Sequence, residues 1–251
     1  RADVSASGSR PSGAGYTHDW SFDVDSRSGA QVAATFTPKL SGVLQVILEQ
    51  RYDDSYAPTV EWANLRYQFT PEFSVRAGRI VLPAFLVSEH RKVGYANPWV
   101  RPPVEVYSLV PISSSDGVDA SYRVTSGDLT STFQGSYGAS EAKLPNGGGA
   151  AKAKDAWGLA YTAEVGNATA HVSYHQARLT LPSYTPLFDA FRQFGAEGVA
   201  IAEQYDVVNK PFAFVGIGGA YNPGRWFAMA EWGATDSNSV LGKRSAWYVS
   251  G

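Results

Sequence analysis

The chain has 251 residues, a formal net charge of -2 and no cysteine. This length admits one large β domain or two small ones, and the lack of cysteine excludes disulfides and thiol catalysis. A near-neutral charge without any Lys/Arg-rich run argues against nucleic acid as a partner. No apolar run approaches the ~20 residues that a membrane helix needs.

After a Ser/Gly/Asp-rich loop at residues 1–27, apolar and polar residues alternate in successive segments, as expected for β-strands with one apolar face. In the second segment, for example, Leu44, Val46 and Leu48 alternate with Gln45 and Glu49. We predict eleven strands, at Ser28–Phe36, Ser41–Tyr52, Thr59–Phe69, Phe73–Val81, Gly117–Val124, Leu129–Gly138, Ala156–Val165, Ala168–Leu179, Phe212–Tyr221, Trp226–Ala234 and Ser245–Gly251.

Short turns alternate with longer connections along these strands. The turns are Thr37-Pro38, Thr70-Pro71, Ser126-Gly127, Gly166-Asn167 and Pro223-Gly224. The longer connections include 82–115, which holds five prolines, a Gly/Lys/Ala-rich loop at 139–154, and 180–210. A membrane barrel has short turns at one rim and long loops at the other. The sequence therefore predicts an all-β fold, a single antiparallel up-and-down transmembrane β-barrel domain over 1–251.

The alternation also predicts which side chains face lipid and which face the lumen. We expect the outward set to be Leu44, Val46, Leu48, Leu65, Tyr67, Leu159 and Tyr161. The lumen-facing set is Gln45, Glu49, Asn64, Arg66, Gln68, Asp119 and Arg123, because Arg or Lys on the lipid side at mid-depth costs about 2–4 kcal/mol. Glu61 shares an apolar strand face and is expected at the external rim. Most tryptophans lie near strand ends, as in an interfacial girdle, although core packing in a soluble protein is the alternative.

Four segments resemble a known family: Glu49-Gln50-Arg51-Tyr52-Asp53, Val60-Glu61-Trp62-Ala63-Asn64, Arg76-Ala77-Gly78-Arg79 and, above all, Arg91-Lys92-Val93-Gly94-Tyr95-Ala96-Asn97-Pro98-Trp99-Val100-Arg101-Pro102-Pro103. They are similar to Gram-negative outer-membrane porins, in a porin-like group of proteobacteria. The resemblance implies a barrel of about 16 strands in the outer membrane, commonly a homotrimer. Family members usually close with a terminal aromatic, whereas this chain ends in Val249-Ser250-Gly251, so we expect the sequence to be incomplete at one or both ends.

In such porins a long early loop folds into the lumen and narrows it. We therefore expect 82–115 to be a constriction loop, whose candidate residues are Arg79, His90, Arg91, Lys92, Arg101 and Glu105. Its charge leans positive, and Arg/Lys rings favour anions. The alternative is that Arg91, Lys92 and Arg101 are solvated on an outer loop.

Two further segments are candidates for a functional role. His171, Ser173 and His175 share a strand face, but positions four apart lie roughly 13 Å apart, too far for one metal ion. No orienting acid for a hydrolase is evident either, so we predict polar lumen residues. The 180–210 connection has a plausible helix, 186–204, broken near Gly195, which could cap the mouth, plug the lumen or contact a neighbouring subunit.

The favoured hypothesis is a passive porin in the lipid bilayer for small hydrophilic solutes or ions, with an anion preference. It needs no catalytic residue, metal or cofactor, and we expect no enzymatic activity. One alternative is a non-conducting barrel in adhesion or surface structure. The other is a soluble carbohydrate-binding β protein that uses its surface Trp and Tyr.

Overall fold

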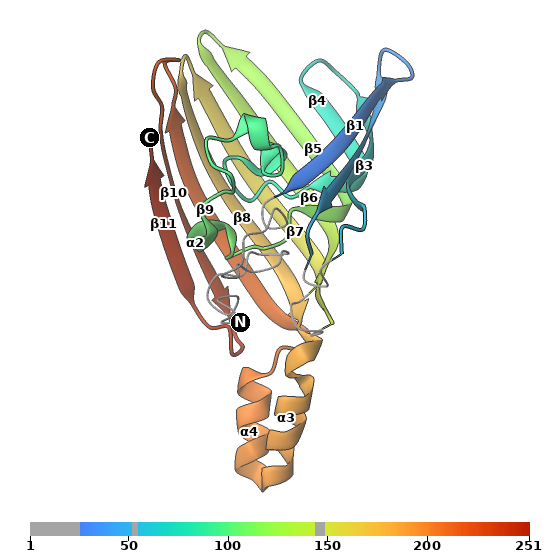
Figure 1. Cartoon of the computed structure of the whole chain (residues 1–251), viewed down its shortest axis with the longest axis vertical. Coiled ribbons are helices and arrows are strands. Elements are labelled where there is room, and N and C mark those ends of the chain that lie inside the picture. Colours follow the sequence, from blue (N-terminus) through green and yellow to red (C-terminus); the bar gives the residue numbers. More distant parts are fainter. Residues whose placement is uncertain (1–25, 52–54, 144–148) are drawn as a thin grey trace.

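The computed structural model describes residues 26–51, 55–143 and 149–251, without the side chain of Tyr95. The described chain forms one eleven-stranded sheet in which each strand pairs with its neighbour in sequence (Figure 1). The strands are β1 (Arg27–Thr35), β2 (Leu40–Glu49), β3 (Thr59–Gln68), β4 (Phe73–Val81), β5 (Ser114–Ser126), β6 (Leu129–Lys143), β7 (Ala150–Val165), β8 (Ala168–Thr180), β9 (Lys210–Tyr221), β10 (Ala228–Ser237) and β11 (Arg244–Ser250).

All strand pairs are antiparallel, so the sheet is the predicted up-and-down meander. The five short turns consequently lie at one rim. Hydrogen bonds join neighbouring turns there: the Arg123 N–H donates to the Glu72 carbonyl at 2.8 Å, and the Asn222 N–H donates to the Asn167 carbonyl at 2.9 Å. The predicted all-β architecture and the common rim of the turns are confirmed.

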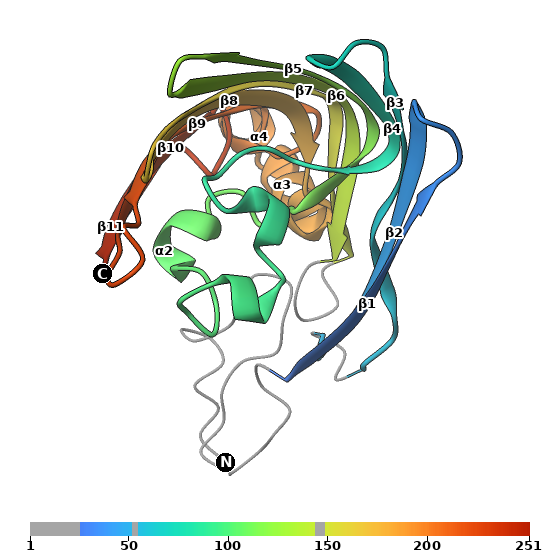
Figure 2. The ribbon, with the colours of Figure 1, turned by 90° about the horizontal axis from the view of Figure 1, so that it is seen from above.

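The sheet is a curved single layer with two different faces (Figure 2). We call the convex side the outer face; it exposes large apolar side chains such as Leu65 (52%), Leu159 (59%) and Trp247 (69%). Of the seven residues predicted to point outward, Leu44, Leu48, Leu65, Tyr67 and Leu159 are exposed, and Val46 and Tyr161 are half-buried. A soluble sandwich would bury these side chains in its core, so the outer face is suited to hydrocarbon.

Among the tryptophans, Trp157, Trp226, Trp232 and Trp247 are exposed, as a girdle requires. Trp99 is an exception because it packs in the interior, where its indole N–H donates to Ser250 Oγ at 3.0 Å. Trp20 lies outside the described residues.

The predicted loop at 139–154 is wrong in the residues that the structure describes. Strands β6 and β7 continue through most of it, and two irregularities accommodate them, between Gly138 and Ser140 and between Lys154 and Trp157. The many small residues of this segment favour a loop. In the structure, however, Ala151 and Ala153 are buried while Lys152 and Lys154 are exposed. That alternation is a strand pattern. Residues 144–148 lie outside the described residues.

A row of three paired glycines crosses the sheet where β4, β5 and β6 meet: Gly78, Gly117 and Gly138. Gly78 has a φ of +122°, which disfavours any side chain. A Cβ on it would lie 2.3 Å from the Ala63 carbonyl oxygen, and one on Gly117 would lie 2.1 Å from the Tyr137 carbonyl oxygen. The strands approach closely here only because these positions lack side chains.

Two long connections leave the rim opposite the short turns. Between β4 and β5, short helical turns η1 (Ser88–His90), η2 (Gly94–Ala96) and α2 (Val104–Tyr107) lie inside the curve of the sheet (Figure 2). Between β8 and β9, η3 (Pro182–Tyr184), α3 (Thr185–Phe191), η4 (Arg192–Phe194) and α4 (Gly195–Tyr205) form a helical hairpin that projects away from the sheet (Figure 1). The predicted helix over 186–204 is thus two helices, and they separate at Gly195, whose φ is +72°.

No helix within the described residues is both long and apolar enough to cross a membrane.

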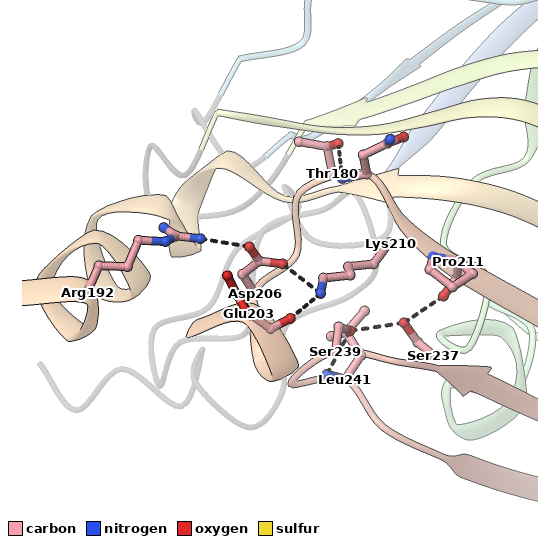
Figure 3. A network of polar contacts seen from close by, with 10 residues as sticks. Thr180, Arg192, Glu203, Asp206, Lys210, Pro211, Ser237, Ser239 and Leu241 are labelled. Carbon is pink, nitrogen blue, oxygen red and sulfur yellow. Dashed lines mark hydrogen bonds and ion pairs between the residues drawn. The ribbon is translucent and has the colours of Figure 1, made fainter. Parts of the chain in front are cut away.

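The base of the hairpin is fixed to the strands by polar contacts (Figure 3). Asp206 accepts from Arg192 Nη2 at 2.8 Å and pairs with Lys210 Nζ at 3.1 Å. Lys210 also donates to the Glu203 carbonyl, and the Asn209 N–H donates to Thr180 Oγ1 at 3.0 Å. Beside them, Ser237, Ser239 and Leu241 form a further chain of hydrogen bonds that reaches the Pro211 carbonyl. Together with the buried cluster of Phe188, Ala202 and Ala151, these contacts join the hairpin to the strands.

Candidate functional site

The segment between β4 and β5, residues 82–113, is called the interior loop because it lies inside the curve of the sheet (Figure 2). Its own apolar residues form a small core against the wall. Ala84, Phe85, Val106 and Tyr107 cluster with Phe214 of β9, and the Phe85 and Tyr107 rings stack with centroids 4.3 Å apart. Burial of these aromatic side chains holds the loop against the strands.

The inner faces of β8, β9 and β10 are shaped to receive the loop. A Cβ on Gly216 would lie 2.8 Å from the Ala84 carbonyl oxygen, and one on Gly233 would lie 3.1 Å from Leu109. Ser173 Oγ donates to the Ala84 carbonyl at 2.7 Å, and His175 Nε2 is 3.2 Å from the Pro83 carbonyl oxygen. Glycines therefore allow close approach, and neighbouring polar side chains bind the backbone of the loop.

The predicted polar row of His171, Ser173 and His175 does lie on the inner face, where all three are buried. Ser173 and His175 bind the loop backbone, while His171 Nδ1 is 3.0 Å from Thr162 Oγ1 on β7. Two of the three residues therefore belong to the wall that anchors the interior loop.

Glu231 of β10 is the strongest single anchor of the loop, and sequence reasoning missed it. Its side chain is buried, and Oε2 accepts from the hydroxyls of Tyr107 and Tyr248, each at 2.6 Å. Oε1 accepts from the Leu86 N–H at 2.7 Å. Burial and the adjacent Glu231 carboxylate raise the pKa of Tyr107 far above its usual range, so its hydroxyl stays a donor. The sequence signal that could have identified Glu231 is a single acidic residue close to the inner-face glycines of β9 and β10.

On its other side the loop is tied to β1, β2 and β3 by an ion-pair cluster. Lys92 Nζ lies 2.8 Å from Glu49 Oε1 and 3.1 Å from Glu61 Oε2, and Arg27 Nε lies 2.8 Å from Glu49 Oε2. Arg27 also donates to the Lys92 carbonyl at 3.4 Å. The loop thus spans the interior from one side of the curved sheet to the other.

The position of Glu61 corrects one prediction. Near the rim as expected, Glu61 nevertheless turns to the inner side and is buried against Lys92. The β2–β3 register shifts between Gln45 and Val46, so Glu61 is the additional residue of a bulge. A bulge interrupts the strict alternation from which its outward direction was predicted.

The structure distributes the predicted constriction residues unevenly. Arg91 is inside the loop: its guanidinium donates to the Tyr107 and Val110 carbonyls, each at 3.2 Å, and lies 5.2 Å from the Tyr107 ring centroid. Burial lowers the pKa of Arg91. His90 and Glu105 are exposed, and Arg101 is half-buried.

Arg79 lines the same cavity as Lys92, but its side chain pairs with Asp116, Nε to Oδ1 at 2.7 Å and Nη2 to Oδ2 at 2.6 Å. The predicted set is therefore not one cluster. Lys92 joins the strand acids, Arg91 stabilises the loop from within, and Arg79 belongs to the β4–β5 pair.

The predicted lumen-facing residues mostly bind their neighbours on the wall. Gln45 donates to Gln31, Asn64 to the Arg79 carbonyl, Gln68 to carbonyls of the adjacent turn, and Arg123 pairs with Glu164 at 3.0 Å. Glu49 belongs to the Lys92 cluster, and Arg66 is exposed.

Asp119 has a partner that sequence reasoning missed. It is almost fully buried and accepts from Arg76 Nε at 2.9 Å and from Gln134 Nε2 at 2.6 Å. Arg76 alternates with Val75 and Ala77 in β4, which was a usable signal for an inner-face cation.

A cavity of about 670 Å³ lies beside the interior loop near the rim of long connections. Charged side chains of both signs line it, including Glu49, Glu61, Lys92, Arg51 and Arg79. Such a space suits hydrated polar solutes. No cluster of three or more acidic or histidine side chains able to hold a metal ion occurs within residues 26–51, 55–143 and 149–251.

No family model matches the chain, and no curated protein sequence matches it significantly. Solved structures do match. A loop L8 deletion mutant of OmpT, an outer membrane protein of Vibrio cholerae, is 12% identical, with 89% of this chain and 77% of that chain covered and a TM-score of 0.35. OmpT of Vibrio cholerae expressed in the outer membrane is also 12% identical, with 90% of this chain and 72% of that chain covered and a TM-score of 0.35. A trimer form of OmpT folded in vitro is 12% identical, with 89% of this chain and 73% of that chain covered and a TM-score of 0.35.

The match to these outer-membrane proteins corrects the expectation that the chain has no enzymatic activity. Likeness at such low identity and TM-score concerns the fold alone, and it gives no ground for excluding catalysis, so that expectation is withdrawn. The barrel-type fold itself rests on the strand order and on the contrast between the two faces of the sheet.

Proposed function

We propose that this chain is the major part of an outer-membrane channel through which small hydrophilic solutes diffuse passively. The observation that supports this most directly is the single curved sheet, apolar on its outer face and rich in polar and charged groups on its inner face. A wide membrane barrel with a polar interior encloses an aqueous path. The interior loop would then narrow that path.

The proposal requires further strands beside β1 and β11, because neither edge pairs with another strand in the described part of the chain. Unpaired backbone groups cannot face hydrocarbon. These strands would come from the rest of a longer chain or from another chain. The homotrimer implied by the porin resemblance stays a prediction.

Planar-bilayer recordings on the intact protein test the proposal. We expect stepwise conductance that rises with salt concentration, because ions would carry the current through water. Insertion without conductance would instead favour a non-conducting barrel, and a protein that stays soluble without detergent would favour the carbohydrate-binding alternative.

The anion preference also stays a prediction, and its test needs a suitable residue. Arg91 is unsuitable because it stabilises the loop, so its loss would perturb folding. Arg66, exposed on the inner face, is a better choice. Arg66→Gln should shift the reversal potential in a salt gradient towards cation preference, whereas Arg225→Gln at an exposed turn should not.

A further inference from the structure

A second cavity lies beside the charged one and differs from it in chemistry. It measures about 260 Å³ and is enclosed between the last residues of the interior loop and the inner faces of β7, β8 and β9. Its walls include Leu109 and Val110 of the loop, Ala153 of β7, Leu181, and Phe214 of β9. All of these are buried or half-buried. We call this space the apolar cavity.

Its size and lining are those of a ligand site for a small molecule. An apolar cavity of roughly 150 Å³ already binds benzene, and ligand pockets are typically apolar with a few polar groups that fix orientation. Here the polar groups include Ser140, His175 and Gln176.

The charged residues around the apolar cavity have one sign. Among the described residues that line it, Lys143 and Arg244 are cationic and none is acidic. Lys143, Pro111 and Ile112 also line the charged cavity, so the two spaces adjoin on that side. An apolar body could therefore be buried while an attached anionic group stays near Lys143, partly hydrated. This avoids the large cost of fully burying an unpaired charge.

We propose that the apolar cavity binds a small organic anion with an apolar body, of the aromatic monocarboxylate class. Apolar walls favour the ring, and the cations select the carboxylate over a neutral analogue. The proposal goes beyond passive diffusion of hydrophilic solutes. It concerns equilibrium binding, so it can fail or succeed independently of whether the protein conducts.

Titration calorimetry on the intact protein in lipid nanodiscs provides the test, with 4-isopropylbenzoate as the probe. We expect saturable binding of this anion, about fivefold weaker binding of 4-isopropylbenzamide, and no measurable binding of acetate. Lys143→Gln and Arg244→Gln should each weaken the carboxylate about fivefold and leave the amide unchanged.

A cavity-filling variant locates the site. Ala153→Leu should abolish binding of both aromatic probes, because the added atoms occupy the apolar cavity. Ala170→Leu, on the exposed outer face of the neighbouring strand, is the matched control and should bind like the parent. Circular dichroism of each variant verifies that the barrel has folded.

Three results would overturn the proposal: no saturable binding of the carboxylate, equal affinity for carboxylate and amide that neither cation changes, or unaltered binding in folded Ala153→Leu. Conductance of the same preparations is recorded in parallel. Binding without conductance would refute the channel alone, and conductance without binding would refute the apolar site alone.

Discussion

The interior loop and the helical hairpin leave the same rim and are of similar length, yet one packs inside the sheet and the other stands clear of it (Figure 1). Both carry large apolar residues: Phe85 of the loop is buried, and Phe194 of the hairpin is 76% exposed. Apolar content alone therefore does not decide where a connection goes. The position of a connection depends on the neighbouring strands, whose residues leave space for its backbone and form hydrogen bonds to it.

The inner face of β8 to β11 offers the loop glycines, two hydrogen-bonding side chains and the Glu231 carboxylate. The hairpin has a different set of contacts: Phe188 and Ala202 belong to a buried cluster with Ala151 of β7, and Arg192, Asp206 and Lys210 bind one another at its base. Each connection is thus fixed by its anchors, and each set of anchors can be removed.

Removing each connection should give the largest difference. Replacing residues 84–110 by a short Gly/Ser linker should raise single-channel conductance severalfold, because the loop occupies the interior. Replacing residues 182–208 in the same way should leave conductance close to that of the parent. Bilayer recordings of the two variants make the comparison. Similar conductance in the loop deletion and the parent would refute the constriction role.

The next largest effect is expected at Glu231. Glu231→Ala leaves two tyrosine hydroxyls and the Leu86 N–H without their acceptor, which should lower the free energy of unfolding by about 3 kcal/mol. Urea unfolding in bilayers measures this. Glu141→Ala, at an exposed position of β6, is the control and should change stability by under ~0.5 kcal/mol. An equal effect of both variants would contradict the anchoring role.

Lys92 anchors the opposite side of the loop and should matter somewhat less. Lys92→Met leaves Glu49 and Glu61 close together without their shared cation and should cost about 2 kcal/mol in the same unfolding assay. Lys243→Met removes a mostly exposed partner of Asp236 and should cost under ~1 kcal/mol. If Lys92→Met lowers the free energy of unfolding no more than Lys243→Met does, the ion pairs of Lys92 do not anchor the loop.

Whether a feature could be predicted from the sequence depends on how far apart in sequence the interacting residues are. Strand alternation and turn chemistry are local, so the meander, the common rim of the turns and the outward leucines could be predicted. The anchors are not local: Glu231 meets Leu86, and Ser173 meets Ala84, only after the sheet has curved. The local sequence marks Glu231 as an acid on the inner face, but it does not show which residue of the loop either side chain meets.

Irregular strand pairing explains two other predictions that were wrong, the direction of Glu61 and the loop at 139–154. Glu61 faces inward because of a bulge, and β6 and β7 run through an Ala/Gly/Lys segment whose composition resembles a loop. The basic residues of the loop are close in sequence, but Arg91 turns into the loop core while Lys92 turns to the wall. Consecutive residues point in different directions, so charge density along the chain does not give charge density in space.

The smallest effect is expected at the tip of the hairpin, where Phe194 should tolerate truncation. Phe194→Ala should change the free energy of unfolding by under ~0.5 kcal/mol, because the side chain has little buried surface to lose. Phe85→Ala removes a buried ring that stacks on Tyr107 and should cost about 3 kcal/mol or more. Urea unfolding of both variants decides whether burial, rather than apolar character, separates the two connections. A cost above ~1 kcal/mol at Phe194 would mean that the assembled protein covers this ring, and the hairpin would then have an anchor of its own beyond its base.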